Sequence, residues 1–269
     1  MVDNFQFKEY YSIDDLIDIV KILRSPDGCP WDKEQDHKSI RRDFLEETYE
    51  VIEAINKDDK DSLLEELGDV LLQVVFHTQI ECEKGTFDFN NVADGICKKM
   101  IERHPHVFGS VKAETSEQVL ENWDVIKKQT KQQKSQTESM LSIPREFPAL
   151  MRADKVQKKA AKVGFDWESV DGAFLKVSEE LEELKQAVTM GVTDNVREEL
   201  GDLIFSVVNV SRFVGVDSEE ALTGATDKFI DRFSKVEKMA NEQGLNMKET
   251  ELSELDKLWD EAKLVSKKD

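Results

Sequence analysis

Residues 46–69 read EETYEVIEAINKDDKDSLLEELGD, and residues 179–202 read EELEELKQAVTMGVTDNVREELGD. Both stretches contain Glu-Glu-x-x-Glu, then fifteen residues, then Glu-x-x-Asp. Each acidic residue of the second copy lies 133 positions after its counterpart in the first. Apolar residues at helical spacing surround the acidic ones, so each stretch predicts two helices joined by a short polar turn, which return antiparallel. The repeat indicates two related modules.

The composition is that of an acidic, helix-rich protein. The chain has 269 residues, a formal net charge of −20 and 35% charged residues. It contains only 12 glycines and 5 prolines, which favours long helices over turn-rich β structure. We therefore predict an all-α fold of two tandem helical modules, whose antiparallel hairpins pack into bundles. The acidity disfavours duplex nucleic acid as a partner, because duplex binding requires a basic surface.

The cysteines and the N-terminus bear on the compartment. Cys29, Cys82 and Cys97 form no Cys-x-x-Cys motif, so we expect reduced thiols and a cytoplasmic protein. Residues 1–11 lack the basic and apolar segments of a signal peptide. No run of about 18 apolar residues is present, so we expect no membrane span.

The helical pattern also predicts the module boundaries. In the first half we expect helices over residues 12–24, 39–57, 59–84, 91–102 and 116–128, and a rigid loop over 26–31. In the second half we expect helices over residues 149–162, 172–190, 194–213, 218–241 and 250–263. Ser12 and Ser218 are the expected caps of their helices. The Gln-rich segment 129–139 is predicted to be a linker or a frayed helix end. The predicted organisation is an N-terminal module over 1–130, a linker over 131–145 and a C-terminal module over 146–269.

Eight carboxylates of the repeat are candidate metal ligands. Residues three or four apart share a helix face, so each helix of a hairpin can present a carboxylate pair to the other helix. The candidates are Glu47, Glu50, Glu66 and Asp69 in the first module and Glu180, Glu183, Glu199 and Asp202 in the second. Carboxylate oxygens favour hard cations, so we expect Mg²⁺, with Mn²⁺ as a substitute.

Other interpretations of the acidic residues remain open. A single copy is more often a solvated helix face, and duplication of a purely structural hairpin also preserves spacing. A di-iron bundle requires Glu-x-x-His on paired helices. Here the equivalent position is Asp, and His77 has Val210 as its counterpart, so iron is disfavoured.

Basic and aromatic residues later in each module are candidate nucleotide contacts. Lys228 and Arg232 lie one helical turn apart and can bind phosphate oxygens; the alternative is ordinary surface charge. Trp259 can stack on a base, but a core aromatic on a terminal helix is the more common role. The looser counterparts in the first module are Lys99, Arg103 and Trp123.

These motifs together resemble a known family. In the first module they are GCPWDKEQ (28–35), LEETYE (45–50), EELGD (65–69) and RHPHVFG (103–109). In the second they are VGFDW (163–167), EELEE (179–183), EELGD (198–202) and KFIDRF (228–233). Over nearly its whole length, the chain resembles two tandem modules of the MazG family, nucleoside triphosphate pyrophosphohydrolases of the all-α NTP pyrophosphatase superfamily.

The resemblance implies Mg²⁺-dependent hydrolysis of nucleoside triphosphates to the monophosphate and pyrophosphate. It further implies broad base specificity, a house-cleaning role and a homodimer. Both quartets match the family's metal ligands, and the residues that would line the second nucleotide site are Lys176, Glu179, Asn195, Arg197, Lys228, Arg232 and Trp259. Asp43 stands where Lys176 stands in the second module, so the first module lacks one cation of the pattern.

Two carboxylates are candidate general bases. Glu179 and Glu46 each lie one residue from the predicted ligand face, where they can take a proton from water that attacks the α-phosphorus. The alternative function is a non-catalytic, nucleotide- or metal-binding helical scaffold with a regulatory role, which would release no pyrophosphate. A purely structural acidic bundle would not respond to Mg²⁺ and nucleotide at all.

Overall fold

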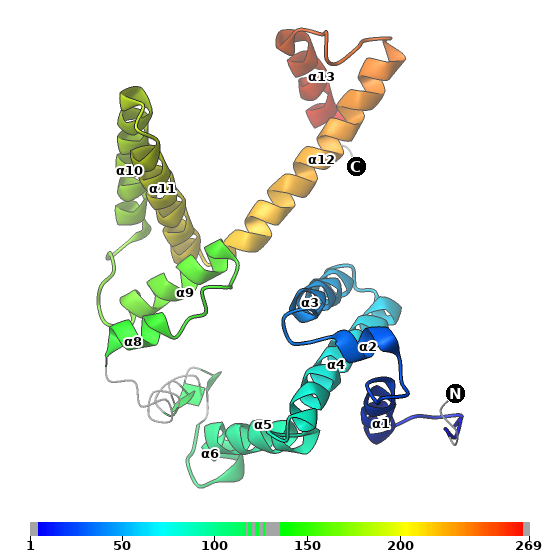
Figure 1. Ribbon diagram of the computed structural model, residues 1–269. Helices are drawn as coiled ribbons and strands as arrows, with labels where there is room; N and C mark the ends of the chain where they lie inside the picture. Colours follow the sequence, from blue (N-terminus) through cyan, green and yellow to red (C-terminus); the bar gives the residue numbers. More distant parts are fainter. Residues whose placement is uncertain are drawn as a thin grey trace. The chain divides into compact units, whose positions relative to one another are not determined.

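The computed structural model describes residues 5–113, 115, 116, 118, 119, 122, 123, 126 and 135–265. Every regular element in these residues is an α-helix, which confirms the predicted fold class (Figure 1). The chain divides into two compact units, Met1–Lys131 and Gln132–Asp269. The helix expected over 116–128 lies largely outside the described residues.

The first unit is organised around a hairpin of α3 (Arg41–Asn56) and α4 (Lys60–Glu83). Asp58 adopts a left-handed conformation with φ 52°, and the carboxylate of Asp59 accepts hydrogen bonds from the first backbone N–H groups of α4. A left-handed residue followed by an N-cap reverses the chain within a few residues. The predicted antiparallel hairpin is therefore confirmed.

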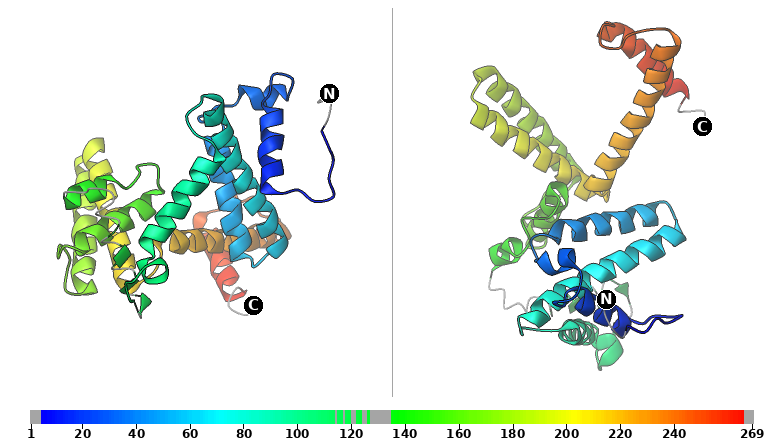
Figure 2. Two further views of the ribbon diagram at one scale, coloured as in Figure 1. Left: turned by 90° about the horizontal axis from the view of Figure 1, so that it is seen from below. Right: turned by 45° about the vertical axis from the view of Figure 1, so that its right-hand side comes forward.

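Shorter helices complete the first unit. They are α1 (Ile13–Leu23), α2 (Pro30–Glu34), α5 (Phe89–Arg103) and α6 (Pro105–Phe108). Ser12 caps α1 in a capping box with Asp15, as predicted. Helix α1 packs against α4, and the buried core of this unit consists of Val20, Ile40, Val75, Phe76 and Ile80. Figure 2 shows α3 and α4 lying side by side from two further directions.

The second unit repeats the hairpin with α10 (Val170–Met190) and α11 (Thr193–Val214). Gly191 ends α10 with φ 72°, a conformation that glycine adopts at little cost. Helix α9 (Ala149–Ala161) packs against α11, and α8 (Gln136–Leu141) packs against α9.

The last two helices, α12 (Ser218–Glu242) and α13 (Leu252–Val265), form a second packed pair in this unit (Figure 1). Their buried core consists of Val236, Ala240, Leu258 and Ala262.

Three local expectations were wrong. Helix α2 begins at Pro30 inside the segment expected to be a loop, because proline is well suited to the first position of a helix. The cap of α12 is Asp217 and not Ser218, since the Asp217 carboxylate accepts hydrogen bonds from the N–H groups of Glu219 and Glu220. Residues 136–139, expected as linker or frayed helix, belong to α8, which Ser135 caps.

Within the part of the chain that the structure describes, none of the helices combines the length and hydrophobicity that crossing a bilayer requires.

Candidate active site

The hairpin of the second unit gathers its four acidic residues between α10 and α11. One oxygen each of Glu180, Glu199 and Asp202 lies within 4.8 Å of the others, and Glu183 forms a similar group with Glu179 and Glu180. Glu180 belongs to both groups and is only 4% exposed. The predicted quartet is therefore brought together, with Glu180 at its centre.

Burial of Glu180 requires a compensating charge, since an isolated carboxylate is costly to bury. The Nζ atom of Lys176, one turn earlier on α10, lies 2.5 Å from Oε1 of Glu180 and 2.9 Å from Oε1 of Glu179. These two hydrogen bonds raise the pKa of Lys176 above its ordinary value. A single cation thus balances part of the charge of the site.

Among the described residues, no lysine or arginine forms a salt bridge with the other three carboxylates of this cluster, Glu183, Glu199 and Asp202. Burial raises the pKa of the Glu199 carboxyl above its ordinary value, and the charges of Glu183 and Glu180 raise it further. Repulsion among carboxylates that share a site is relieved when a divalent cation binds between them.

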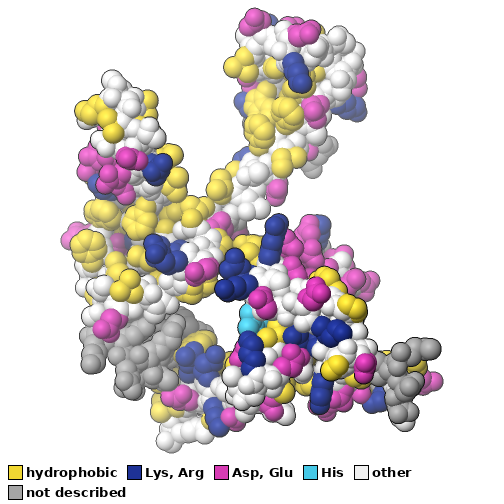
Figure 3. All heavy atoms as spheres, viewed as in Figure 1, with side chains coloured by type: hydrophobic (Ala, Val, Ile, Leu, Met, Phe, Trp, Pro, Cys, Tyr) yellow, Lys and Arg dark blue, Asp and Glu magenta, His cyan; other side chains and the backbone are white. Residues whose placement is uncertain are grey.

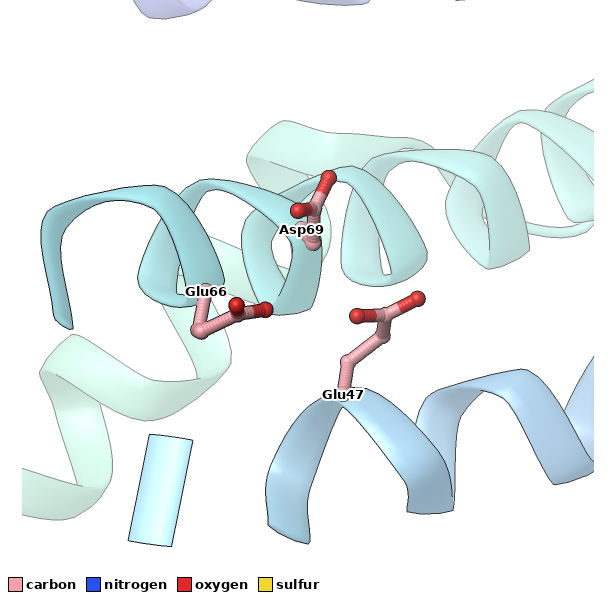
Figure 4. Close-up of side chains that lie close together, drawn as sticks. All are labelled: Glu47, Glu66 and Asp69. Carbon is pink, nitrogen blue, oxygen red and sulfur yellow. The ribbon is translucent and has the colours of Figure 1, made fainter. Parts of the chain in front are cut away.

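The hairpin of the first unit forms the matching cluster. Figure 4 shows Glu47 on α3 and Glu66 on α4 with their carboxylates turned toward each other across the gap, and Asp69 on the next turn of α4. One oxygen of each lies within 4.8 Å of the others. Burial is the main reason that the pKa of Glu47 is raised, and the negative charges of Asp69 and Glu50 raise it further. Glu50 therefore belongs to the same cluster.

The two clusters differ in the basic side chains that neighbour them. Asp43 occupies the place of Lys176 and adds a negative charge that further raises the pKa of Glu47. Within the described residues, no lysine or arginine forms a salt bridge with Glu47 or with Asp69. The first cluster consequently carries more uncompensated negative charge than the second.

The two candidate bases lie beside the clusters and are exposed. Glu179 bonds to Lys176, while Oε1 of Glu46 accepts a hydrogen bond from Nε of Arg42 at 2.9 Å. Asn195 and Arg197 lie near the start of α11 and are also exposed, and Arg197 pairs with Asp194 at 3.1 Å.

The remaining predicted nucleotide contacts of the second unit lie on α12 and α13. Trp259 packs beside Phe229, with ring centroids 5.0 Å apart, and against the buried core of these helices, so its ring is half-buried. Lys228 is exposed. Arg232 has its Nε atom buried without a hydrogen-bond partner in the described structure, which leaves a donor for a phosphate oxygen.

The first unit shows a similar arrangement. The Arg103 guanidinium lies 6.0 Å from the ring centroid of Trp123, and its Nε atom is likewise buried without a partner among the described residues. Lys99 is exposed. Arg103 and Arg232, which correspond in the repeat, therefore share an unusual hydrogen-bonding state.

A cavity of about 380 Å³ adjoins the second cluster and was not predicted from the sequence. Lys176, Glu180 and Asp202 form one part of its lining, and the buried polar residues Gln157 and Asn209 form another. One residue in the sequence could have indicated a polar lining here. Asn209 is a polar residue between valines of α11, and the residue at the equivalent position of the first module is Phe76.

Comparison with known proteins agrees with the repeat. A family model described as the MazG nucleotide pyrophosphohydrolase domain matches residues 35–108 and again residues 169–237. Each match contains one complete carboxylate quartet.

Individual relatives match the chain beyond these two domain regions, over more than nine tenths of its length. The nucleoside triphosphate pyrophosphohydrolase of Escherichia coli (strain K12) is 45% identical over 254 residues, which cover 93% of this chain and 97% of that protein. The nucleoside triphosphate pyrophosphohydrolase/pyrophosphatase MazG of Thermotoga maritima is 44% identical over 250 residues, with coverage of 93% and 95%. YabN of Bacillus subtilis, named as uncharacterized, is 46% identical over 257 residues, which cover 94% of this chain and 52% of that protein. The chain belongs to the MazG family and carries two copies of its domain in tandem.

Proposed function

We propose that this protein hydrolyses nucleoside triphosphates, with ribose or deoxyribose, to the nucleoside monophosphate and pyrophosphate. Broad base specificity and a role in controlling or cleaning the nucleotide pool are part of the proposal. The observation that carries it is the pair of carboxylate clusters, each held between the helices of a hairpin. The names of the relatives from E. coli and T. maritima support the same reaction.

The donor set fits Mg²⁺, with Mn²⁺ as a substitute. All donors are carboxylate oxygens. Burial, and after it the charges of neighbouring carboxylates, raises the pKa values of Glu47 and Glu199, so a divalent cation would stabilise both clusters. The ligands would be Glu180, Glu183, Glu199 and Asp202 in the second unit and Glu47, Glu50, Glu66 and Asp69 in the first. When bound, Mg²⁺ would orient the triphosphate and neutralise charge on the leaving pyrophosphate.

The carboxylates beside the clusters are proposed to handle the proton. Water oxygen bonds to the α-phosphorus while the bond from that phosphorus to the α,β-bridging oxygen breaks, and the electron pair leaves with pyrophosphate. Glu179, or Glu46 in the first unit, would take the proton from the water. Both side chains are exposed, so water reaches them, and each neighbours a proposed metal ligand.

Cations would bind the rest of the substrate. Lys228 and Arg232 would bind phosphate oxygens, and the buried, unpaired Nε atom of Arg232 supports this assignment. Asn195 and Arg197 would contact the nucleotide near the start of α11, where the helix dipole favours anions. Lys176 would contact it beside Glu179 and Glu180, with which it pairs. Trp259 would line the same site. The counterparts in the first unit would be Lys99, Arg103 and Trp123.

A homodimer is part of the proposal, because the hairpin of the second unit leaves large apolar side chains exposed. Leu175 is 73% exposed and Val188 is 59% exposed. Others in these two helices with more than two fifths of their area exposed are Phe174, Leu181, Met190, Leu200, Ile204, Phe205, Val207 and Val214. Figure 3 shows hydrophobic side chains over α10 and α11. A second copy would bury such a surface in a four-helix bundle.

The compartment follows from the substrate. The three cysteines are free thiols, and nucleoside triphosphates are cytoplasmic metabolites, so we place the activity in the cytoplasm.

The proposal is tested by measuring pyrophosphate release from a panel of ribo- and deoxyribonucleoside triphosphates with Mg²⁺, with Mn²⁺ and with a chelator. We expect equal amounts of pyrophosphate and monophosphate with either metal and none with the chelator. Binding of nucleotide without pyrophosphate release would instead identify a non-catalytic scaffold.

A further inference from the structure

Two histidines of the first unit are in direct contact and take no part in the proposed reaction. His37 lies in the turn before α3, and His77 lies on α4. Their Nδ1 atoms are 2.8 Å apart, and their ring planes differ by only 11°. The ring centroids are 5.1 Å apart, which is the nitrogen separation plus roughly one ring radius on either side. The rings therefore meet edge to edge, with each Nδ1 directed at the other.

The protonation of His37 is constrained by Glu81. Nε2 of His37 lies 2.6 Å from Oε1 of Glu81. Hydrogen bonds from Lys84, Thr86 and His37 lower the pKa of Glu81 to about 2, so near neutral pH its carboxylate is ionised and can only accept. His37 must therefore carry a proton on Nε2. When His37 is neutral, its Nδ1 is a bare acceptor, and His77 donates to it from its own Nδ1.

The contact between the two rings can hold one proton but not two. A hydrogen bond between two Nδ1 atoms requires one N–H group and one bare nitrogen. The pair meets this condition when both rings are neutral, and again when one ring is positively charged. A second charge places an N–H group on both nitrogens, so that two donors of like charge face each other. Protonation of both His37 and His77 is therefore incompatible with a separation of 2.8 Å.

The surroundings of the pair disfavour the second proton. Burial lowers the pKa of His77, and the charge of His37 lowers it further. Helix α3 presents the uncharged ring of Phe44, whose centroid lies 5.8 Å from that of His77. Other charged groups at this end of α4 are Glu81 and Lys84 on α4 itself, Asp36 and Lys38 in the turn, Arg24 paired with Glu83 at the end of α1, and Asp88, which caps α5.

The contact closes the open end of the α3–α4 hairpin. The reversal at Asp58 and Asp59 joins the two helices at the other end. The turn that carries His37 is held in shape by Oδ1 of Asp36, which accepts hydrogen bonds from the N–H groups of Lys38 and Ser39. The chain then enters α3 directly. The link between His37 and His77 thus ties the start of α3 to the second half of α4.

Histidine titration is confined to the first unit. All four histidines of the chain lie before residue 131, and the counterpart of His77 in the second hairpin is Val210. The other two histidines, His104 and His106, are not joined in the same way. Their rings are tilted by 50°, and Nδ1 of His104 lies 2.6 Å from the backbone oxygen of Met100. They provide an internal control for the pair.

We propose that His37 and His77 form a proton-bridged clasp, which is closed near neutral pH and opens in mild acid when both rings become charged. Opening releases the start of α3 from α4 in the first unit and leaves the second hairpin unchanged. Because folding lowers the pKa of His77, the open form binds more protons. The stability that the clasp contributes is therefore present above the unfolded pKa of 6.5 and is lost as the pH falls below it.

Nitrogen-15 magnetic resonance of the imidazole rings tests the clasp in the full chain, because only four histidines contribute signals. At about pH 7.5 we expect a scalar coupling between the Nδ1 atoms of His37 and His77 through their shared proton. The coupling should disappear near pH 5, when both nitrogens carry a proton. A coupling that is absent at both pH values, or Nδ1 atoms that are never both protonated down to pH 5, overturns the proposal.

Two histidine-to-glutamine substitutions provide a matched comparison. In His77→Gln the amide can donate to a neutral His37 or accept from a charged one, and it does not titrate, so the contact no longer depends on pH. His106→Gln makes the same change outside the clasp. The measured quantity is the hydrogen-exchange protection factor of the Ile40 amide, which donates to the backbone oxygen of Asp36 within the turn. The amide of Val208 on α11 serves as the reference.

In the unmodified protein and in His106→Gln, we expect the protection factor of Ile40 to fall roughly tenfold between pH 7 and pH 5, the ratio that corresponds to one unit of pKa difference. In His77→Gln the fall should be much smaller, and Val208 should behave alike in all three proteins. An equal fall for Ile40 in His77→Gln overturns the proposal. If His77→Gln does not fold, the coupling between the ring nitrogens of the unmodified protein decides.

Discussion

The Nζ atom of Lys176 lies 2.5 Å from Oε1 of Glu180, one turn further along α10, and forms the only cationic contact of that buried carboxylate among the described residues. In the first unit the corresponding residue is Asp43. The same duplicated hairpin therefore carries an internal counter-ion in one copy and an additional anion in the other. Because of this difference, we expect the two sites to differ in stability without metal and in nucleotide turnover.

Removal of the counter-ion Lys176 should make the thermal stability of the second unit depend on bound metal. Lys176→Met leaves Glu180 buried without a partner, which we expect to cost about 1 kcal/mol, because Lys176 is partly exposed. The melting temperature should fall without Mg²⁺ and recover with it. Lys185→Met is the matched control on the same helix, since Lys185 pairs with the exposed Glu182. Equal loss in both variants would argue against a special role for Lys176.

Neutralising ligands of the second cluster should separate activity from stability. Glu199→Gln with Asp202→Asn removes metal-binding charge but little packing, so we expect pyrophosphate release from this unit to be lost. The raised pKa of Glu199 means that folding disfavours its charged form. The metal-free double variant should therefore melt no lower than the unmodified protein. Near-normal turnover in this variant would rule out the second unit as the catalytic site.

The equivalent double substitution in the first unit tests whether its carboxylate cluster is catalytically active. Glu66→Gln with Asp69→Asn should lower Mn²⁺ binding to the chain, measured by electron paramagnetic resonance, and should raise the melting temperature without metal. Because Asp43 replaces Lys176 and Phe76 replaces Asn209, we expect nucleotide turnover to fall less than in the second-unit variant. A larger loss of turnover here would reverse the assignment of the two units.

Acid should weaken the first unit through Glu81. Its carboxylate accepts hydrogen bonds from Lys84, Thr86 and His37, which lower its pKa from 4.5 to about 2. Since the folded-state pKa is depressed, this contribution to stability is present above the unfolded pKa of 4.5 and is lost as the pH falls toward about 2.

The measurement is urea unfolding of Glu81→Gln between pH 6 and about 2.5. The variant should be less stable at pH 6, and the difference should shrink as the pH falls. Glu53→Gln, which removes an exposed helical ion pair with Lys57, is the control and should change little at any pH. A difference that stays constant with pH would exclude this titration.

The carboxylate clusters were predictable because they depend on local geometry. Helical periodicity determines which residues share a face, so the spacing of Glu66 and Asp69, together with a short turn at Asp58 and Asp59, is enough to bring the pairs together. The family motifs added the proposed nucleotide contacts, such as Arg232, which stay a prediction. For the same reason most helix ends were predicted closely, with Ser12 as the clearest case.

The cavity was not predictable because it depends on how helices distant in the sequence pack. Gln157 lies on α9 and Asn209 on α11, and no local pattern indicates that their side chains line one space. The prediction of the α12 cap was wrong for a different reason. Asp217 and Ser218 are both good N-cap residues, and only the backbone geometry distinguishes them.

The most direct test of the central claim is a crystal structure of the protein with Mn²⁺ and a triphosphate whose α,β bridge cannot be hydrolysed. We predict an anomalous Mn²⁺ peak bound by Glu180, Glu183, Glu199 and Asp202, with phosphate oxygens completing its coordination. A triphosphate bound away from these side chains, or Mn²⁺ absent from between α10 and α11, would contradict the account.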